Sequence, residues 1–309
     1  MDKSPHKSDF VSVNGINLHY LDWGGKGDVL LFLAGRGCNA HNFDDFAPRF
    51  TDKFHVMALT RRGHGESGYP ETGYAIDTLT EDIRQFLDTL NIEKVILAGH
   101  SFAGIELSRF SALHPERVLK LIFLDAAYDR SSTSYKSMVE KSPLRHIQAP
   151  GLDVDYYSED NYFAAMKRAF PLVTTIWTEA MEEQCRHEIM QTPEGKIVEK
   201  MSDTIGKAIT DTMISYVPED SKITAPTLSF FAMSKGVYNI SDDWMTEEQK
   251  TQVIDHFETT VNSNIRENIE QFRQNVPHAK IIEIPQGHHF CFIKHEELVY
   301  EEMRRFLSE

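Results

Sequence analysis

The feature of the sequence that most restricts the fold is a strand that changes into a helix at a single serine. A short, mainly apolar run, Lys94–Ala98, is typical of a buried parallel strand, and apolar residues recur at helical spacing after Ser101 as far as Leu113. Small residues, Gly99 and Ala103, stand two positions before and after the serine, because so sharp a turn leaves no room for larger ones. This arrangement predicts a nucleophile elbow. A helix start capped by Ser101 is the alternative interpretation.

The elbow geometry gives the serine a possible chemical role. It lifts the Ser101 hydroxyl clear of the sheet and directs the backbone N–H of Phe102 and the helix N-terminus at any oxyanion formed there. Ala103 stands where the usual G-x-S-x-G pattern has its second glycine, and alanine still fits the space.

The charge balance restricts the partners that the chain can be expected to bind. Among 309 residues, 47 are acidic and 32 are basic, which gives a net charge of −15. Nucleic acids and anionic membranes both favour a basic surface. We therefore expect a small-molecule substrate, no nucleic acid and no membrane as partners, and the sequence leaves the oligomeric state open.

The cysteines and the N-terminal segment bear on the compartment. Cys38, Cys185 and Cys291 lie far apart with no C-x-x-C pattern, so the sequence predicts neither a disulfide framework nor a metal site. Residues 1–9 are polar and contain no apolar signal-peptide core. We expect a cytoplasmic protein, although a chain whose signal peptide had been removed would look the same.

Predicted strands alternate with predicted helices over most of the chain. Asn14-Gly15 indicates a hairpin, Thr78 and Glu81 predict a capping box at a helix start, and apolar residues at spacings of three or four from Ile254 to Phe272 indicate a long helix. Further strands are predicted at Val29–Leu33, Phe54–Leu59, Val118–Leu124, Thr227–Phe231 and Lys280–Ile284. The fold class expected is α/β, with a mostly parallel central sheet and helices on both faces.

The alternation stops in the middle of the chain. From about Asp129 to Lys222 no strand–helix rhythm is visible, and segments that look helical are interrupted by prolines. We expect residues 130–222 to form an inserted helical cap, and residues 1–129 and 223–309 to form the core domain.

At this point the chain resembles the α/β-hydrolase superfamily. The resemblance rests on the strand into Ala34-Gly35, the Arg62–Ser67 turn, the elbow, the His114–Val118 segment and the Ile284–Phe290 segment, and it covers nearly all of the chain outside the cap. It implies that a nucleophile, an acid and a base follow one another along the chain in that order. It implies no cofactor and no metal.

The resemblance places the base after the last predicted strand. A serine hydroxyl needs an imidazole to accept its proton, and that imidazole needs a carboxylate to fix its tautomer. Two histidines, His288 and His289, are adjacent there. The match of the His289–Phe292 segment to the family's histidine-aromatic segment selects His289, and His288 is the alternative.

The acid is where this chain departs from the commonest pattern of the family. Lys235 falls where most relatives carry the aspartate, and Asp242 and its neighbour Asp243 come later. Some members place the acid after the preceding strand of the sheet, which here is Asp125. A carboxylate that ends an apolar strand is costly to bury unless something pairs with it, and an imidazolium would do so. We therefore expect Asp125 to be the acid, with Asp129 in reserve; a capping role for Asp125 is the alternative.

The resemblance also predicts the groups that would bind an oxyanion. The backbone N–H groups of Phe102 and Arg36 are the expected donors, since Arg36 follows the Ala34-Gly35 pair. The Arg36 side chain is expected to pair with a nearby carboxylate. The Gly63–Gly68 segment matches the dinucleotide pattern G-x-G-x-x-G, but loop residues follow it where a helix should begin, so no cofactor is predicted.

The function expected from these residues is that of a serine hydrolase that cleaves an ester, amide or related acyl bond of a small molecule. Relatives that hydrolyse epoxides or carbon–halogen bonds use an aspartate nucleophile, and Ser101 argues against both reactions. Two alternatives stay open: hydrolysis of a carbon–carbon bond with the same triad, and a ligand-binding receptor that kept the fold without catalysis.

Overall fold

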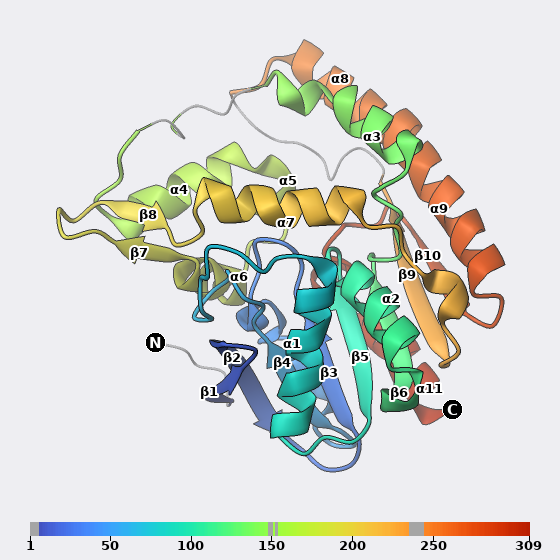
Figure 1. Cartoon of the computed structure of the whole chain (residues 1–309). Coiled ribbons are helices and arrows are strands. Elements are labelled where there is room, and N and C mark those ends of the chain that lie inside the picture. The colour runs from blue at the N-terminus through green and yellow to red at the C-terminus, as the bar shows by residue number, and fades with distance from the viewer. Residues whose placement is uncertain (1–5, 148–150, 152–153, 235–243) are drawn as a thin grey trace.

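A computed structural model describes residues 6–147, 151, 154–234 and 244–309. Lys235, which stands where most relatives carry the acid, and the later Asp242 and Asp243 lie outside the described residues. In the described part of the chain, eight strands form one sheet in the order β1-β2-β4-β3-β5-β6-β9-β10 (Figure 1). These strands are β1 (Lys7–Val13), β2 (Ile16–Gly24), β3 (Val29–Leu33), β4 (His55–Leu59), β5 (Val95–His100), β6 (Val118–Leu124), β9 (Thr227–Met233) and β10 (Lys280–Pro285).

The sheet is mostly parallel. The pairs β1–β2 and β2–β4 are antiparallel. The pairs β4–β3, β3–β5, β5–β6, β6–β9 and β9–β10 are parallel. Asn14 and Gly15 form the predicted β1–β2 turn, with φ angles of 46° and 78°, which is the left-handed backbone that an Asn-Gly hairpin turn requires. The predicted fold class is confirmed.

Apolar side chains on both faces of the sheet explain why helices cover both faces. In β3, Leu31 and Leu33 belong to one buried cluster, which includes side chains of α1, α2 and α9. The alternate residues Leu30 and Phe32 belong to the other, which includes side chains of α11. Because neighbouring residues of a strand point to opposite faces, both faces need cover, and burying each such side chain contributes about 1.5–3 kcal/mol.

The helices of the core include the three that the sequence predicts, after Ser101, near Thr78 and from Ile254 to Phe272, with one correction. They are α1 (Ile76–Thr89), α2 (Ala103–Leu113), α8 (Glu247–His256), α9 (Asn262–Asn275), α10 (Cys291–Lys294) and α11 (Glu296–Ser308). The capping box predicted for Thr78 and Glu81 is wrong: α1 begins at Ile76, Ala75 is the N-cap residue, and no side chain caps it. Glu81 pairs instead with Arg84, one turn further along the helix, at 2.6 Å.

The long helix predicted from Ile254 to Phe272 is present as α8 and α9, joined by one π-helical turn, η7 (Phe257–Val261). A π turn inserts one extra residue into an α-helix, and such turns are frequent at functional sites. Phe257 and Val261 both line the large cavity described below.

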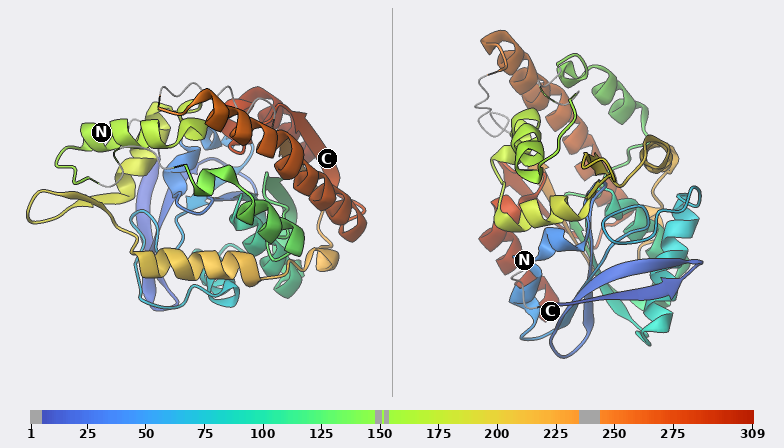
Figure 2. Two further views of the ribbon diagram at one scale, coloured as in Figure 1. Left: turned by 90° about the horizontal axis from the view of Figure 1, so that it is seen from above. Right: turned by 90° about the vertical axis from the view of Figure 1, so that its left-hand side faces the viewer.

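Between β6 and β9 the chain leaves the sheet. It forms α3 (Thr133–Glu140), η4 (Pro143–Arg145), α4 (Glu159–Ala169), α5 (Pro171–Thr174), α6 (Glu179–His187), β7 (Ile189–Gln191), β8 (Ile197–Glu199), α7 (Asp203–Ser215) and η5 (Asp220–Lys222). The β7–β8 hairpin was not visible in the sequence pattern. Ile205 and Ile209 of α7 pack on Phe102 and Ile105 at the start of α2, and Figures 1 and 2 show α3, α7 and the α8–α9 helix around the same end of the sheet. A cap domain at 130–222 stays a prediction.

Two further expectations concern the cysteines and the membrane. Cys38, Cys185 and Cys291 are free thiols. No helix in the described ranges combines the length and the apolar character that a membrane span requires.

We predict that His19, a buried residue of β2, makes stability depend on pH. Burial, followed by the nearby His41 and His187, lowers the pKa of His19 to about 3. Between about pH 3 and 6.5 the unfolded chain therefore binds more protons at this residue, and the free energy of unfolding falls as the pH falls. We expect the stability cost of His19→Gln, measured by urea unfolding, to be about 2 kcal/mol smaller at pH 5 than at pH 7.5. A cost independent of pH would contradict the assignment.

Candidate active site

Ser101 lies in the tight turn between β5 and α2. Its φ angle is 54°, a backbone conformation that is strained for a residue other than glycine and that is found at functional sites. A Cβ added to Gly99 would lie 2.8 Å from Leu107 Cδ1 and 3.0 Å from Ala103 Cβ. The small residues predicted on either side of the serine are therefore required by the close approach of the strand end to α2.

The structure brings the three side chains predicted for the site into one hydrogen-bonded chain. Ser101 Oγ lies 2.9 Å from His289 Nε2, and His289 Nδ1 lies 2.6 Å from Asp125 Oδ2. An ionised carboxylate only accepts hydrogen bonds, so Nδ1 of His289 carries a proton and its N–H donates a hydrogen bond to Asp125. In the neutral imidazole Nε2 is then an acceptor, and it faces the serine hydroxyl.

Three donors hold the Asp125 carboxylate in place. Besides His289, the backbone N–H of Ala232 donates to Oδ1 at 2.9 Å, and the Tyr128 hydroxyl donates to the same oxygen. The residue is 5% exposed and has a φ angle of 50°. A buried carboxylate is tolerated where it is fully hydrogen-bonded, and these contacts fix which oxygen faces the histidine.

The register of the parallel strands explains why residues so far apart in sequence meet. His100 pairs with Leu124, so Ser101 and Asp125 follow neighbouring strands at the same level. A Cβ on Gly104 would lie 1.9 Å from the carbonyl oxygen of Ala126, so the start of α2 packs directly against the chain that follows β6. His289 comes from the loop after β10. Ligand sites of open α/β sheets form at this carboxyl edge of the strands.

Of the two adjacent histidines, His289 is the one that reaches Ser101. His288 is buried, and its Nδ1 accepts a hydrogen bond from the N–H of Phe290 at 3.0 Å. His100 supports the loop from the other side, because its Nε2 donates to the carbonyl oxygen of His289 at 3.0 Å. Burial, and then the charge of His289, lower the pKa of His100 well below its usual value, so His100 stays neutral.

The loop after β3 brings the second predicted oxyanion donor against the elbow. Leu33 pairs with Gly99 in the sheet, and a Cβ added to Gly35 would lie 3.1 Å from Ser101 Cβ. Phe102 is fully buried at the start of α2, and Arg36 is exposed. Among the described residues, the side chain of Arg36 forms no ion pair, contrary to the expectation from the sequence, and it lines the cavity next to Ser101.

A buried ion pair fixes this loop. Arg61 Nε donates to Glu106 Oε1 of α2 at 2.6 Å, and Nη2 donates to the carbonyl oxygen of Ala34 at 2.8 Å. The guanidinium also lies 4.6 Å from the centre of the Phe102 ring. Arg61 thus ties the loop after β3 to the first turns of α2, between which an oxyanion would be bound.

Asp129, the reserve for the acid, has a different role. Its Oδ1 accepts hydrogen bonds from the backbone N–H of Ser131 at 2.9 Å and from the Ser131 hydroxyl at 2.5 Å. These bonds form a local turn ahead of α3, and Asp129 makes no hydrogen bond to His289. Of Asp125 and Asp129, only Asp125 contacts His289.

A cavity of about 620 Å³ opens next to the triad. Ser101, His289 and Asp125 all line it. The other walls come from α3, η4, α7 and the α8–α9 helix; they include Tyr135, Met138, Val139, Leu144, Met213, Phe257, Val261 and Ile265. A mainly apolar cavity with a few convergent polar groups is typical of a small-molecule site.

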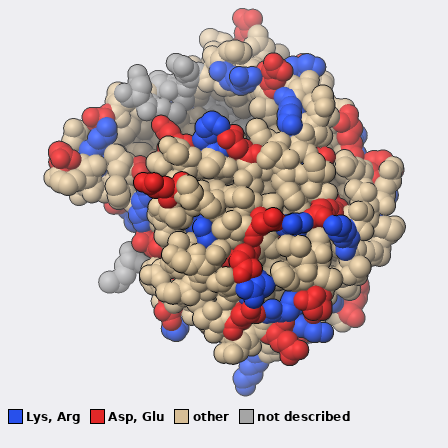
Figure 3. Space-filling view, in the orientation of Figure 1, with Lys and Arg blue, Asp and Glu red and all other residues tan. Residues whose placement is uncertain are grey.

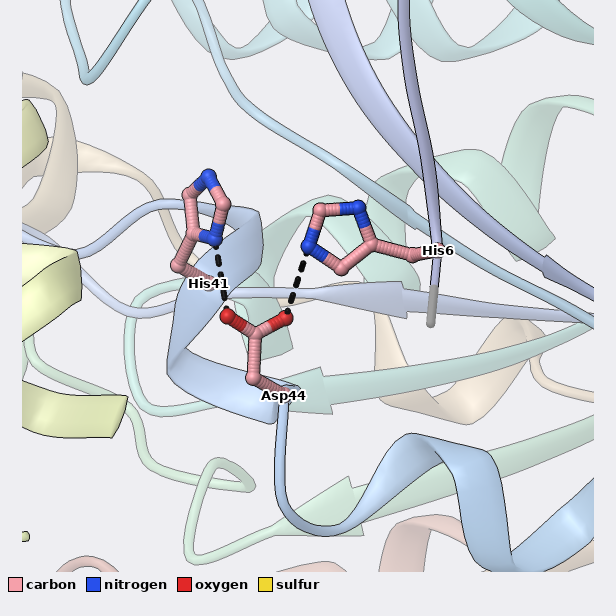
Figure 4. Close-up of side chains that lie close together, drawn as sticks. All are labelled: His6, His41 and Asp44. Carbon is pink, nitrogen blue, oxygen red and sulfur yellow. Dashed lines mark hydrogen bonds and ion pairs between the residues drawn. The ribbon is translucent and has the colours of Figure 1, made fainter. Parts of the chain in front are cut away.

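A second group of polar side chains could hold a metal ion. The ligand atoms of His6, His41 and Asp44 lie within 4.8 Å of one another. Asp44 bridges the two histidines, 2.8 Å from His41 Nδ1 and 3.5 Å from His6 Nε2 (Figure 4). Two imidazoles and a carboxylate suit a divalent transition metal. None of the three lines the cavity next to Ser101, so the triad does not depend on this group.

Residues 28–296 match the family model described as the alpha/beta hydrolase fold. The chain belongs to the α/β-hydrolase family. The resemblance seen in the sequence is therefore confirmed.

Individual relatives match only part of the chain in sequence. A putative non-heme haloperoxidase of Mycobacterium phage D29 is 36% identical over 104 residues, which are 33% of this chain and 37% of that protein. Epoxide hydrolase 4 of Mus musculus is 30% identical over 179 residues, 53% of this chain and 48% of that protein. The chain thus spans less than half the length of these curated relatives.

Solved structures match over nearly the whole chain. E-2-(acetamidomethylene)succinate hydrolase has a TM-score of 0.73 at 19% identity, covering 98% of this chain and 100% of that one. A marine microorganism esterase has a TM-score of 0.66 at 22% identity, covering 96% and 100%. At these identities the likeness shows the fold alone.

Three contributors to the site were missed by the sequence analysis. Tyr128 and the backbone of Ala232 hold Asp125, and His100 holds the loop of His289. Burial, followed by the charge of Asp125, raises the pKa of Tyr128 well above its usual value, so its hydroxyl stays a donor. No spacing rule marks Tyr128 or Ala232, whereas His100 could have been noted as a polar residue at the end of an apolar strand.

We predict that Gly35→Ala impairs the oxyanion loop while leaving the fold intact. The added Cβ would lie 3.1 Å from both Ser101 Cβ and His100 Nδ1, so the loop must move by a few tenths of an ångström. We expect kcat for 4-nitrophenyl acetate to fall by about 10–100-fold, because catalytic donors tolerate little displacement. Gly68→Ala is the matched control, since its Cβ would meet only contacts of 3.4 Å or more. Equal rates in both variants would refute the prediction.

Proposed function

We propose that the protein is a serine hydrolase that cleaves an ester, amide or related acyl bond of a small molecule. The observation that carries the proposal is the unbroken hydrogen-bonded chain from Ser101 through His289 to Asp125, which opens onto a cavity. Membership of the α/β-hydrolase family and relatives named as hydrolases support it.

The first half of the reaction forms an acyl-enzyme. Ser101 Oγ attacks the carbonyl carbon while His289 Nε2 accepts the hydroxyl proton, and Asp125 stabilises the imidazolium that forms. The backbone N–H groups of Phe102 and Arg36 bind the negative oxygen of the tetrahedral intermediate. When the intermediate collapses, the bond to the leaving group breaks, and His289 passes its proton to that group.

The second half releases the acyl group. A water molecule gives a proton to His289 Nε2 as its oxygen attacks the acyl carbon, and the same N–H donors bind the new oxyanion. The bond from the acyl carbon to Ser101 Oγ then breaks, and the serine recovers its proton from His289. The products are a carboxylic acid and an alcohol or amine, and no cofactor takes part.

Two of the alternatives to acyl hydrolysis, epoxide opening and ligand binding without catalysis, fit the site less well. Epoxide hydrolases and haloperoxidases are among the named relatives, but an epoxide-opening reaction of the aspartate type requires a carboxylate at position 101. A receptor without catalysis would not require the Asp125 carboxylate to be held by Tyr128 and Ala232. Hydrolysis of a carbon–carbon bond would use the same three side chains and stays the alternative. We propose acyl hydrolysis because an esterase is among the structural neighbours.

We predict that the triad acid is Asp125. Asp125→Asn leaves a hydrogen-bonding group in place but favours the wrong tautomer of His289, so kcat for 4-nitrophenyl butyrate should fall by about 10³–10⁴-fold. Ser101→Ala should lower kcat by about 10⁵–10⁶-fold. Asp129→Asn changes a nearby carboxylate that does not contact His289 and should retain most of the activity. Comparable activity of the two asparagine variants would overturn the assignment, and an undiminished Ser101→Ala protein would overturn the proposed function.

A further inference from the structure

Arg130 is a buried arginine that forms no ion pair with a carboxylate of the described residues. It lies between β6 and α3 and is 5% exposed. In the part of the chain that the structure describes, Arg130 makes two polar contacts. Nη1 donates a long hydrogen bond of 3.5 Å to the carbonyl oxygen of Ser101, and the guanidinium lies 5.3 Å from the centre of the Tyr128 ring. Neither contact neutralises the charge of the guanidinium.

Two other buried arginines among the described residues have their charge neutralised by a carboxylate of the fold. Arg61 and Arg62 are 8% and 3% exposed, and each forms a two-pronged ion pair, with Glu106 and with Asp82 respectively. Removing an arginine from water costs several kcal/mol unless an anion and further hydrogen bonds compensate. Arg130 is as buried as these two, and no described residue supplies it with an anion.

The position of Arg130 indicates where the missing anion would come from. Arg130 lines the same cavity as Ser101 and His289. Two more arginines, Arg36 and Arg145, line that cavity. Among the described lining residues the one acidic group is the carboxylate of Asp125, which His289 already engages. The cavity is thus locally positive in a chain of net charge −15. Outside it, acidic and basic side chains are interspersed over the face seen in Figure 3.

We propose that Arg130 binds a carboxylate of the substrate, so that the substrate class is a small acyl compound with a free carboxylate near the scissile carbonyl. This inference rests on the proposed function. The hydrogen bond of Arg130 to the Ser101 carbonyl places the guanidinium next to the nucleophile, which requires a short spacer between the carboxylate and the reacting carbonyl. The planar fork of the guanidinium matches a carboxylate in a bidentate manner.

The remaining lining restricts the rest of the molecule. Apart from the arginines and the triad, many of the residues around the cavity are apolar, from Met138 and Val139 of α3 to Val261 and Ile265 of the α8–α9 helix. A single buried arginine balances one negative charge. The expected ligand is therefore a monoanion with an apolar remainder. A phosphate, with a charge of about −1.5 to −2 at neutral pH, fits this balance less well.

The test compares two chromogenic esters that differ only in charge. Mono(4-nitrophenyl) glutarate carries the carboxylate, and its methyl ester is the neutral twin. We expect the wild-type protein to hydrolyse the charged ester with a kcat/KM about 10–100-fold higher, the range that a charge-assisted pair supplies. Arg130→Met should remove this preference through a higher KM for the charged ester and leave the neutral ester within about threefold of wild type. Arg305→Met, at an exposed arginine that does not line the cavity, is the matched control and should keep the preference.

A stability measurement separates binding from a structural role. If Arg130 serves the substrate, Arg130→Met removes an uncompensated buried charge, and Tm should stay equal or rise. A lower Tm together with equal losses for both esters would show that Arg130 supports the elbow, and would overturn the inference. Competition by inorganic phosphate but not by monomethyl glutarate would overturn the choice of a carboxylate.

The outcomes for the two proposals are distinguishable. If the wild-type protein hydrolyses neither ester, the proposed function fails. If it hydrolyses both equally, only the inference about Arg130 fails. Binding of monomethyl glutarate to the Ser101→Ala protein, measured by calorimetry, tests the carboxylate site without turnover: weaker binding after Arg130→Met supports it, and unchanged binding contradicts it.

Discussion

The hydrogen bond between His289 Nδ1 and Asp125 is the interaction on which the rest of the site depends. It fixes the tautomer and the orientation of the imidazole, and only this tautomer presents a basic Nε2 to Ser101. The bond exists because parallel strands end at one edge of the sheet, with Ser101 after β5, Asp125 after β6 and His289 after β10. Asp125 can occupy that position because Ala232 and Tyr128 satisfy its second oxygen.

The main features of the fold and of the triad could be predicted because they follow from local rules. The elbow is marked by Gly99 and Ala103, the strands by apolar runs, and the hairpin by Asn14-Gly15. What escaped prediction depends on tertiary contacts. Examples are the β7–β8 hairpin and the start of α1 without a side-chain cap. Arg36 is a third, since it pairs with no carboxylate of the described residues. Lys235 stands at the usual acid position and cannot act as a carboxylate. The sequence therefore predicted an acid at the end of the neighbouring strand, at Asp125.

Charge is distributed in this chain in a way that composition alone conceals. A net charge of −15 suggests an acidic protein that would repel anions. Among the described residues, the cavity next to Ser101 is nonetheless lined by three arginines and by one carboxylate, which His289 already engages. Buried arginines elsewhere, at Arg61 and Arg62, are neutralised within the fold. The positive charge that is not neutralised within the fold thus lies where a substrate would bind. The low polarity of the cavity strengthens the attraction between this charge and an anion.

The proposed reaction requires His289 to activate the Ser101 hydroxyl. The most direct measurement is peptide mass mapping after reaction with a fluorophosphonate, carried out on the wild-type, His289→Ala and His288→Ala proteins. The account predicts one adduct, on the peptide that contains Ser101, present in the wild-type and His288→Ala proteins and lost in His289→Ala. An adduct on another residue, or labelling of Ser101 that survives the loss of His289, would contradict it.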